Sequence, residues 1–425
     1  MGDFMRETML STPEGVRDIY GIECERKHAV ISDIERVLHL YGNRDIETPT
    51  FEYFGIFNAD KGSAPSNEMY KFFDRDNNTL VLRPDFTPSI ARCVAKYFKD
   101  ETLPLRLCYK GQTFASLEKH KGKLSEITQI GSELINDDSS AADAETVACV
   151  IDCLKASGLE EFQIVIGEVD YFKGLIEEAG LDNKIENKVR DYIQIKNFFG
   201  LSEYISGLDM SDKTRNALNA LSSLFGGTDI FEKAEELTDS KRALEAVDRM
   251  KKVYTALTYY GYEKYVSFDL SMINGYDYYT GIVFSGYTYG TGNPVVKGGR
   301  YNNLLSQYGK EAPSIGFSIY VDELMNGLSR QKIPFASKQK SALIVYTIEH
   351  QEAAVLLASS LRAKGIIAQL IRKSKRHEED EYMDYSDTYD VGKIYIMQNE
   401  KTVKIISADR SVDEEKDIET MINEL

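Results

Sequence analysis

The strand-like segments of this sequence fall into two groups, and a long block without strand signals separates them. Before the block, apolar runs and alternating apolar residues predict strands at residues 79–82, 105–109, 125–134 and 162–167. After the block, comparable patterns predict strands at residues 265–272, 281–284 and 316–321. If both groups belong to one sheet, that sheet must accommodate a large insertion between its strands.

The separating block has the pattern of amphipathic helices. Its last apolar residues recur at helical spacing and are Leu244, Val247, Met250, Val253 and Leu257. We therefore predict a helical insertion at about residues 182–262. Two further helices are predicted at residues 25–40 and 141–156, because apolar residues recur there with the same period.

The composition changes again after Ile333-Pro334. From there strand and helix patterns alternate, which is typical of a small α/β domain. At 425 residues the chain exceeds the roughly 100–200 residues of a common domain, so two or three domains are expected. We predict an α+β core domain with an antiparallel sheet at residues 1–333, and a separate small α/β domain at residues 334–425.

Charge and composition argue against several classes of partner. The net charge of −17 opposes binding to a polyanion, so no nucleic-acid partner is expected. No apolar run approaches the roughly 18 residues that span a bilayer, and the first residues lack the apolar stretch of a secretory signal. We expect a cytoplasmic protein without membrane contact. Five cysteines without Cys-x-x-Cys spacing and five scattered histidines predict neither a metal site nor a cofactor.

Short polar motifs accompany the predicted strands in a fixed order. The sequence reads Leu-Arg-Pro-Asp-Phe-Thr at residues 82–87, Gln-Ile-Gly-Ser-Glu at 129–133 and Asp-Tyr-Tyr-Thr-Gly at 277–281. Gly-Gly-Arg-Tyr at 298–301 and Ile-Gly-Phe at 315–317 complete the series. Each motif alone arises often by chance. In this order and spacing, however, the set resembles histidyl-tRNA synthetase, a class II aminoacyl-tRNA synthetase.

The resemblance covers about residues 11–324 and implies the class II synthetase fold, with its antiparallel sheet core. Tyr41-Gly42, followed by Ile46 and Pro49, resembles the first class II motif, which lies at a dimer interface in that family. The resemblance therefore implies a self-dimer through the core domain. The domain at residues 334–425 resembles a reduced anticodon-binding domain.

The resemblance also implies a histidine-binding pocket. The residues that it assigns to this pocket are Asp85, Thr87, Gln129, Glu133, Tyr278 and Tyr279. A neutral imidazole has one N–H donor and one acceptor, so Glu133 can accept from one ring nitrogen while the Tyr279 hydroxyl partners the other. Asp85, Thr87 and Gln129 supply oxygens toward an ammonium group. The synthetase usually has Glu at the position of Asp85, and the shorter side chain reduces its reach.

Three positions depart from the synthetase pattern, because arginines of that family are replaced by Ala115, Asn274 and Glu323. Amino-acid activation displaces pyrophosphate from ATP, and positioned cations stabilise the charge that develops on the phosphates. Guanidinium groups suit this task best. We therefore expect the synthetase reaction to be lost and the chain to have no catalytic residues.

A synthetase-like body without these arginines resembles the regulatory subunits of ATP phosphoribosyltransferase. Leu-Arg-Pro-Asp-x-Thr-Pro at residues 82–88 and Arg-Tyr-Asn-Asn-Leu-Leu at 300–305 are closer to that family than to the synthetase. The resemblance implies a non-catalytic subunit that assembles with a short-form catalytic subunit in the first step of L-histidine biosynthesis. It also implies a role in feedback regulation by histidine.

Other functions are compatible with the same residues. The chain could be a divergent but active histidyl-tRNA synthetase, or a synthetase-like protein repurposed for another amino acid or for signalling. Where histidine binds is also open, because the sequence does not distinguish this pocket from an interface with the catalytic subunit.

Overall fold

The structure is a computed structural model that describes residues 10–57, 65–116, 124–273, 279–334, 341–374, 376–407 and 410–424. The chain divides into two compact units, one from residues 1–18 and 29–333 and the other from residues 19–28 and 334–425. Each unit has apolar cores of its own. Within the described ranges, every helix is too short or too polar to span a lipid bilayer.

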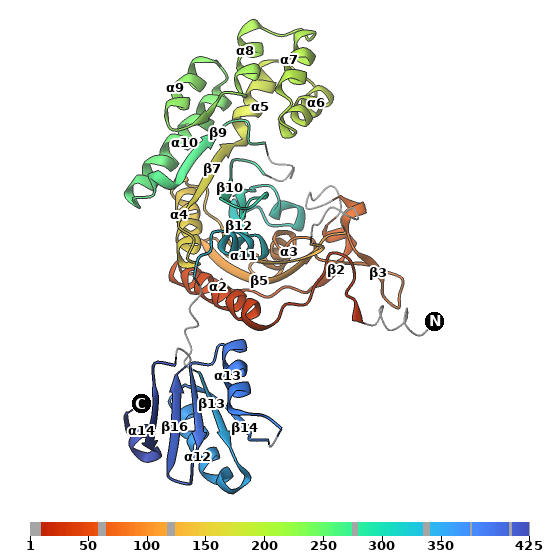
Figure 1. Ribbon diagram of the computed structural model, residues 1–425. Coiled ribbons are helices and arrows are strands. Elements are labelled where there is room, and N and C mark those ends of the chain that lie inside the picture. The colour runs from red at the N-terminus through yellow and green to blue at the C-terminus, as the bar shows by residue number, and fades with distance from the viewer. Residues whose placement is uncertain are drawn as a thin grey trace. The chain divides into compact units, whose positions relative to one another are not determined.

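The larger unit is built around a sheet whose strands follow the order β1-β5-β6-β12-β11-β10-β7-β9-β8 (Figure 1). Each neighbouring pair from β5 to β7 is antiparallel, whereas β1 lies parallel to β5 and β9 parallel to β7. The strands are β1 (Arg44–Asp45), β5 (Leu105–Phe114), β6 (Glu126–Ile135), β7 (Phe162–Glu168), β8 (Phe225–Gly226), β9 (Val266–Asp269), β10 (Ile282–Thr288), β11 (Val296–Arg300) and β12 (Ser314–Tyr320). The predicted antiparallel core is confirmed.

Strands from both sides of the helical block lie side by side in this sheet. β12 pairs with β6, which places Gly316 opposite Glu133, and β10 pairs with β7, which places Ile282 opposite Glu168. The prediction that a helical segment interrupts the strands of one sheet is therefore confirmed. A second, antiparallel sheet has the order β2-β4-β3 and contains β2 (Phe51–Tyr53), β3 (Lys71–Phe73) and β4 (Thr79–Leu82).

Helices gather at one end of the main sheet, where the sequence predicts the insertion (Figure 1). They are α5 (Val169–Glu178), α6 (Asn183–Gln194), α7 (Phe198–Ser206), α8 (Asp212–Ala220), α9 (Asp229–Glu236) and α10 (Lys241–Tyr259). The side chains that accept hydrogen bonds in the first turns of α6, α7, α8 and α10 are Asp182, Asn197, Ser211 and Ser240. In α10, Val247, Met250, Val253 and Leu257 are fully buried, as their helical spacing predicts.

The strand β11 is not among the predicted strands, because it contains Gly298 and Gly299 and glycine is depleted in strands. The structure explains both glycines by close packing. A Cβ atom at Gly298 would overlap the Phe284 ring, and one at Gly299 would lie 2.6 Å from the Tyr279 ring. The two glycines therefore allow β11 to lie in the middle of the sheet.

Side chains alternate between the two faces of the main sheet, as β12 illustrates. Ile315, Phe317 and Ile319 belong to the core that also contains residues of α2 and α4. Gly316 and Ser318 therefore lie on the opposite face, on which α3 packs against β5. These three helices are α2 (Gly21–Leu40), α3 (Thr87–Tyr97) and α4 (Ser140–Ala156). A further helix, α11 (Val321–Arg330), follows β12.

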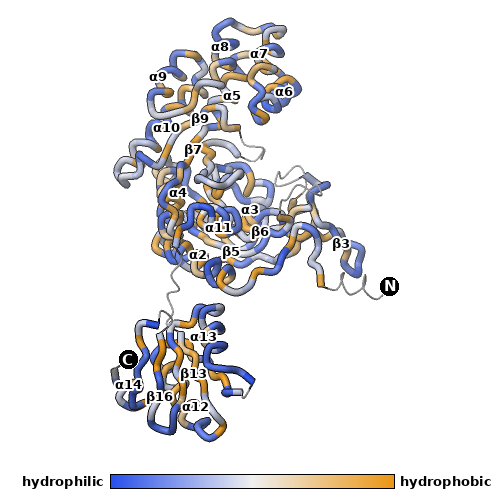
Figure 2. The backbone as a smooth tube through the Cα atoms, viewed as in Figure 1, coloured by the Kyte–Doolittle hydropathy of each residue, from blue (hydrophilic) through white to orange (hydrophobic). Residues whose placement is uncertain are grey.

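The smaller unit contains a sheet of order β14-β13-β15-β16-β17, parallel from β14 to β15 and antiparallel from β15 to β17. Its elements are β13 (Ser341–Tyr346), α12 (Gln351–Ala363), β14 (Ile367–Arg372), α13 (Glu379–Thr388), β15 (Lys393–Met397), β16 (Thr402–Ser407), β17 (Asp413–Asp417) and α14 (Ile418–Glu424). α12 and α14 contribute to one apolar core and α13 to another. Figure 2 shows hydrophobic residues along β13 and a mostly hydrophilic α13. The predicted α/β pattern is confirmed, while the domain boundaries stay a prediction.

Candidate functional site

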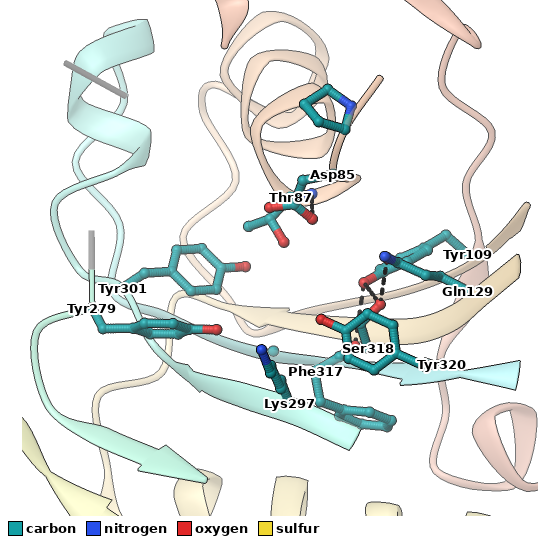
Figure 3. Close-up of a pocket in the computed structure, with 12 residues that line it drawn as sticks. Asp85, Thr87, Tyr109, Gln129, Tyr279, Lys297, Tyr301, Phe317, Ser318 and Tyr320 are labelled. Atoms are coloured by element: carbon teal, nitrogen blue, oxygen red, sulfur yellow. Dashed lines mark hydrogen bonds between the residues drawn. The ribbon is translucent and has the colours of Figure 1, made fainter. Parts of the chain in front are cut away.

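A pocket lies on the face of the main sheet that carries α3, and Figure 3 shows its side chains. The lining residues are Pro84, Asp85, Thr87, Tyr109, Gln129, Tyr279, Lys297, Tyr301, Gly316, Phe317, Ser318 and Tyr320. The empty space among them measures about 430 Å³ and includes solvent at the open mouth of the pocket. Four of the predicted ligand residues, Asp85, Thr87, Gln129 and Tyr279, therefore meet in one pocket.

The segment between β4 and α3 brings Asp85 and Thr87 to the pocket. Thr87 is the first residue of α3, and its backbone N–H donates to Asp85 Oδ1 at 3.4 Å. Arg83 holds this segment to the sheet, because its Nε donates to the Gln112 carbonyl oxygen at 2.8 Å. The Arg83 guanidinium also lies 4.0 Å from the centre of the Phe86 ring. Arg83 therefore positions the segment, while Asp85 and Thr87 line the pocket.

Gln129 extends from β6, and its neighbours fix the orientation of its amide. The amide Nε2 donates to Thr113 Oγ1 at 3.0 Å, and the amide Oε1 accepts from Ser318 Oγ at 2.7 Å. The Tyr109 hydroxyl donates to the Phe317 carbonyl oxygen at 3.2 Å beside this pair. Because an amide oxygen has two lone pairs, Gln129 can accept one further hydrogen bond from a ligand such as an ammonium group.

Glu133 lies beneath the pocket and is only 1% exposed. Its Oε1 accepts from Thr87 Oγ1 at 2.8 Å, and its Oε2 accepts from the Tyr301 hydroxyl. Burial raises the pKa of Glu133 to about 8; the two hydroxyl donors oppose the shift, and the negative charge of Asp85 adds to it. A Cβ atom at Gly316 would overlap the Glu133 carboxyl group, so this glycine makes room for it.

Glu133 is covered by the side chains of Thr87 and Tyr301, which both bind it. For an imidazole N–H to donate to Glu133, one of these hydroxyl groups must move aside or relay the hydrogen bond. The direct contact between Glu133 and a ligand therefore stays a prediction. Tyr279 lines the pocket, whereas Tyr278 and the neighbouring Asp277 lie outside the described residues.

Of the three positions at which the sequence predicts that synthetase arginines are lost, the structure describes Ala115 and Glu323. Ala115 follows β5, and its N–H donates to the Ser125 carbonyl oxygen at 2.8 Å. Glu323 lies in the first turn of α11, where negative charge is favourable, and its Oε1 accepts from Asn293 Nδ2 at 2.8 Å. Neither residue lines the pocket. Asn274 lies outside the described residues.

The structure also brings side chains to the pocket that the sequence did not assign to a ligand. These are Tyr109, Lys297, Tyr301, Ser318 and Tyr320. Ser318 and Tyr320 alternate with apolar residues along β12, and this alternation could have located them. No comparable signal marks Lys297, because its strand is glycine-rich. Among the lining residues that the structure describes, Lys297 is the only lysine, arginine or histidine.

Away from the pocket, His39, Asp45 and Cys108 bring potential metal-ligating atoms within 4.8 Å of one another. Hydrogen bonds already link them, because His39 Nε2 lies 3.1 Å and Cys108 Sγ 3.4 Å from Asp45 Oδ1. Burial and the bond to Asp45 raise the pKa of Cys108 to about 12, which favours the protonated thiol at neutral pH. A metal ion would have to displace this proton. The expected absence of a metal site stays a prediction.

The histidyl-tRNA synthetase family profile matches residues 15–324. Among curated proteins, the ATP phosphoribosyltransferase regulatory subunit of Acetivibrio thermocellus is 38% identical over 366 residues, covering 86% of this chain and 88% of the relative. The ATP phosphoribosyltransferase regulatory subunit of Ruminiclostridium cellulolyticum is 35% identical over 420 residues, covering 99% of this chain and 100% of the relative.

Solved structures agree with these matches. A Bacillus halodurans protein described as an ATP phosphoribosyltransferase regulatory subunit/histidyl-tRNA synthetase has a TM-score of 0.82 and 32% identity, covering 92% of this chain and 99% of that chain. The histidyl-tRNA synthetase of a Nostoc species has a TM-score of 0.81 at 18% identity, covering 98% of this chain and 99% of that chain, and supports the fold alone. The chain belongs to the family of ATP phosphoribosyltransferase regulatory subunits, and its fold is that of histidyl-tRNA synthetases.

Proposed function

We propose that this chain is a non-catalytic regulatory subunit that acts with a short-form catalytic subunit of ATP phosphoribosyltransferase. The pair would carry out the first step of L-histidine biosynthesis and its feedback regulation by histidine. One combination of features carries the proposal: a polar pocket suited to an amino acid is present, while Ala115 and Glu323 occupy positions where a synthetase has arginine. The relatives with the same family name align along most of the chain.

The proposed ligand of the pocket is L-histidine. Asp85, Thr87 and Gln129 line this pocket, and the oxygen atoms of all three would accept hydrogen bonds from its ammonium group. Tyr279 would partner the imidazole ring, and Glu133 would accept from the ring through or in place of its present hydroxyl partners. Convergent polar groups around one concave site support this assignment.

Electrostatics argue against a synthetase reaction in the same site. A guanidinium about 4 Å from a phosphate charge contributes about 4 kcal/mol at an effective dielectric constant near 20. Since each ~1.4 kcal/mol changes a rate tenfold, losing such contacts suppresses turnover by orders of magnitude. Glu323 has the opposite charge to the missing arginine and would repel a phosphate. An active histidyl-tRNA synthetase is therefore not favoured.

The proposal is tested by co-purifying the chain with a candidate catalytic subunit. We expect a stable complex whose phosphoribosyltransferase activity requires both chains and falls when histidine is added. The isolated chain should not exchange pyrophosphate into ATP in a histidine-dependent manner. A clear exchange signal would instead establish a synthetase. Thermal stabilisation by another amino acid, but not by histidine, would favour a repurposed pocket.

Self-association and location complete the proposal. We expect a dimer through the core domain, because Tyr41-Gly42 belongs to a motif resembling the class II interface motif. Sedimentation equilibrium of the isolated chain tests the dimer. A cytoplasmic location is likewise proposed and is tested by cell fractionation.

A further inference from the structure

Lys297 contributes a lysine side chain to the pocket from the main sheet. It lies in β11, between Ser285 of β10 and Ser318 of β12 in the sheet register, and it lines the pocket. Figure 3 shows its amino group rising from the strands near Tyr279, while Asp85 stands in the segment before α3. The pocket thus presents a positive and a negative group from different walls.

A free amino acid carries the complementary pair of charges, an ammonium and a carboxylate on the same carbon. Asp85, with the Thr87 hydroxyl beside it, suits the ammonium group. The carboxylate requires a cation in the same site, because burying it without one is costly. Among the described residues that line the pocket, none is arginine or histidine. Lys297 of β11 is the lysine that can supply the cation.

We infer that Lys297 binds the carboxylate of the amino-acid ligand and makes the pocket selective for ligands whose carboxylate is free. This inference rests on the proposed function, because it takes histidine as the ligand. A lysine suits the task, since its ammonium is a compact charge with three donors on a flexible stem. Histamine and L-histidinol keep the imidazole and the amine but lack the carboxylate, so both should bind more weakly than L-histidine.

An alternative role for Lys297 is to balance a negative charge of the protein itself. Glu133 is one such group, and burial raises its pKa to about 8. If Lys297 only supports the pocket, its substitution should weaken the binding of histidine and histamine alike. If Lys297 binds the carboxylate, its substitution should weaken the binding of histidine alone. The two roles are therefore separated by comparing ligands in the same variant.

The experiment is isothermal titration calorimetry of the full chain, with and without its catalytic partner, against L-histidine, histamine and L-histidinol. A hydrogen bond to a charged group corresponds to about a 10- to 100-fold change in affinity. We expect Lys297→Met to lower the affinity for L-histidine by about this factor. The affinities for histamine and L-histidinol should change by less than about twofold. Lys297→Arg keeps a cation and should retain most of the preference for L-histidine.

Lys252→Met is the matched control, because Lys252 is 63% exposed and remote from the pocket lining. Circular dichroism and thermal unfolding establish that each variant is folded. Equal binding of histidine and histamine by the unsubstituted chain would overturn the role of Lys297, and so would a parallel loss of all three ligands in Lys297→Met. Failure of every ligand to bind the unsubstituted chain, alone and in the complex, would instead overturn the proposed histidine pocket.

Discussion

At the scale of single residues, two buried carboxyl groups make the protein sensitive to pH. Glu133 and Glu168 are almost fully buried, and burial raises the pKa of each to about 8. The ordinary pKa of a glutamate is 4.5. Between these values the folded protein holds protons that the unfolded chain has lost. The free energy of unfolding therefore falls as the pH rises from about 4.5 to 8.

Glu133→Gln should remove part of this pH dependence, because the amide does not titrate. Urea unfolding at pH 5 and pH 8.5 measures it. We expect the unsubstituted chain to lose more stability between the two pH values than the variant, by on the order of 2–4 kcal/mol. Glu232→Gln is the control, since Glu232 is exposed. If the free energy of unfolding fell equally between pH 5 and pH 8.5 in Glu133→Gln and in the unsubstituted chain, Glu133 would already be ionised at neutral pH.

At the scale of elements, Asp143 joins two helices and a strand. It lies in the first turn of α4, where its Oδ1 accepts from Arg300 Nε of β11 at 2.8 Å and its Oδ2 from Arg249 Nε of α10 at 2.7 Å. Asp143 and Arg300 are 0% and 1% exposed. The carboxylate thus ties the helical insertion to the sheet that carries the pocket.

Asp143→Ala should destabilise the protein by about 3–5 kcal/mol, because it removes the buried counter-charge of Arg300 and leaves only the largely exposed Asp138, 3.2 Å from the Arg300 guanidinium. Asp248→Ala is the matched control, since Asp248 pairs with Lys252 on the surface of α10 at 2.6 Å and such pairs contribute about 0–1 kcal/mol. Guanidinium unfolding of both variants gives the difference. If Asp143→Ala cost no more than Asp248→Ala, the buried pairing would not hold the elements together.

Gly316 controls how β12 passes Glu133. A side chain at this position would overlap the Glu133 carboxyl group, and its Cβ atom would lie 2.8 Å from the Ser132 carbonyl oxygen. Gly316→Ala should therefore displace Glu133 or β12 and weaken histidine binding by at least about tenfold. Gly292→Ala is the control, because nothing lies within 4 Å of a Cβ atom there. Calorimetric titration with histidine compares the two, and unchanged affinity in Gly316→Ala would place the ligand elsewhere.

Elements with a regular pattern were predictable from sequence, and those made by close packing were not. The alternation along β6 and β12 and the apolar spacing of α10 are local signals, so these elements were predicted. The strand β11 was missed because Gly298 and Gly299 carry no strand signal, and Lys297 was missed with it. The partners of Glu133 were also not predictable, because Thr87 and Tyr301 lie 46 and 168 residues away along the chain.

At the scale of the whole molecule, the proposed function depends on the predicted loss of synthetase arginines as well as on the retained fold. The fold is shared with histidyl-tRNA synthetases, so it does not distinguish a regulatory subunit from an enzyme. We propose that the distinction lies at Ala115, Asn274 and Glu323, which the comparison of the complete set of motifs with the synthetase pattern identifies. Composition and periodicity alone therefore predicted the helical insertion and the small α/β domain, and the resemblance was needed for the class II fold and for the function.

Regulation by this chain requires coupling between histidine and the catalytic subunit, and thermodynamics makes that coupling reciprocal. If histidine changes the affinity of this chain for the catalytic subunit by some factor, the catalytic subunit must change the affinity for histidine by the same factor. We expect a 5- to 150-fold effect, the range of about 1–3 kcal/mol that is typical of allosteric coupling.

Titration of histidine into the isolated chain and into the complex measures how the catalytic subunit changes the affinity for histidine. Binding of the two subunits at zero and at saturating histidine measures how histidine changes the affinity between them. Lys297→Met is expected to lower the affinity for histidine at its proposed site, so it should shift both histidine titrations to higher concentration. The affinity between the two subunits in the absence of histidine should stay unchanged. Histidine binding that occurs only in the complex and ignores Lys297→Met would place the regulatory site at the interface between subunits.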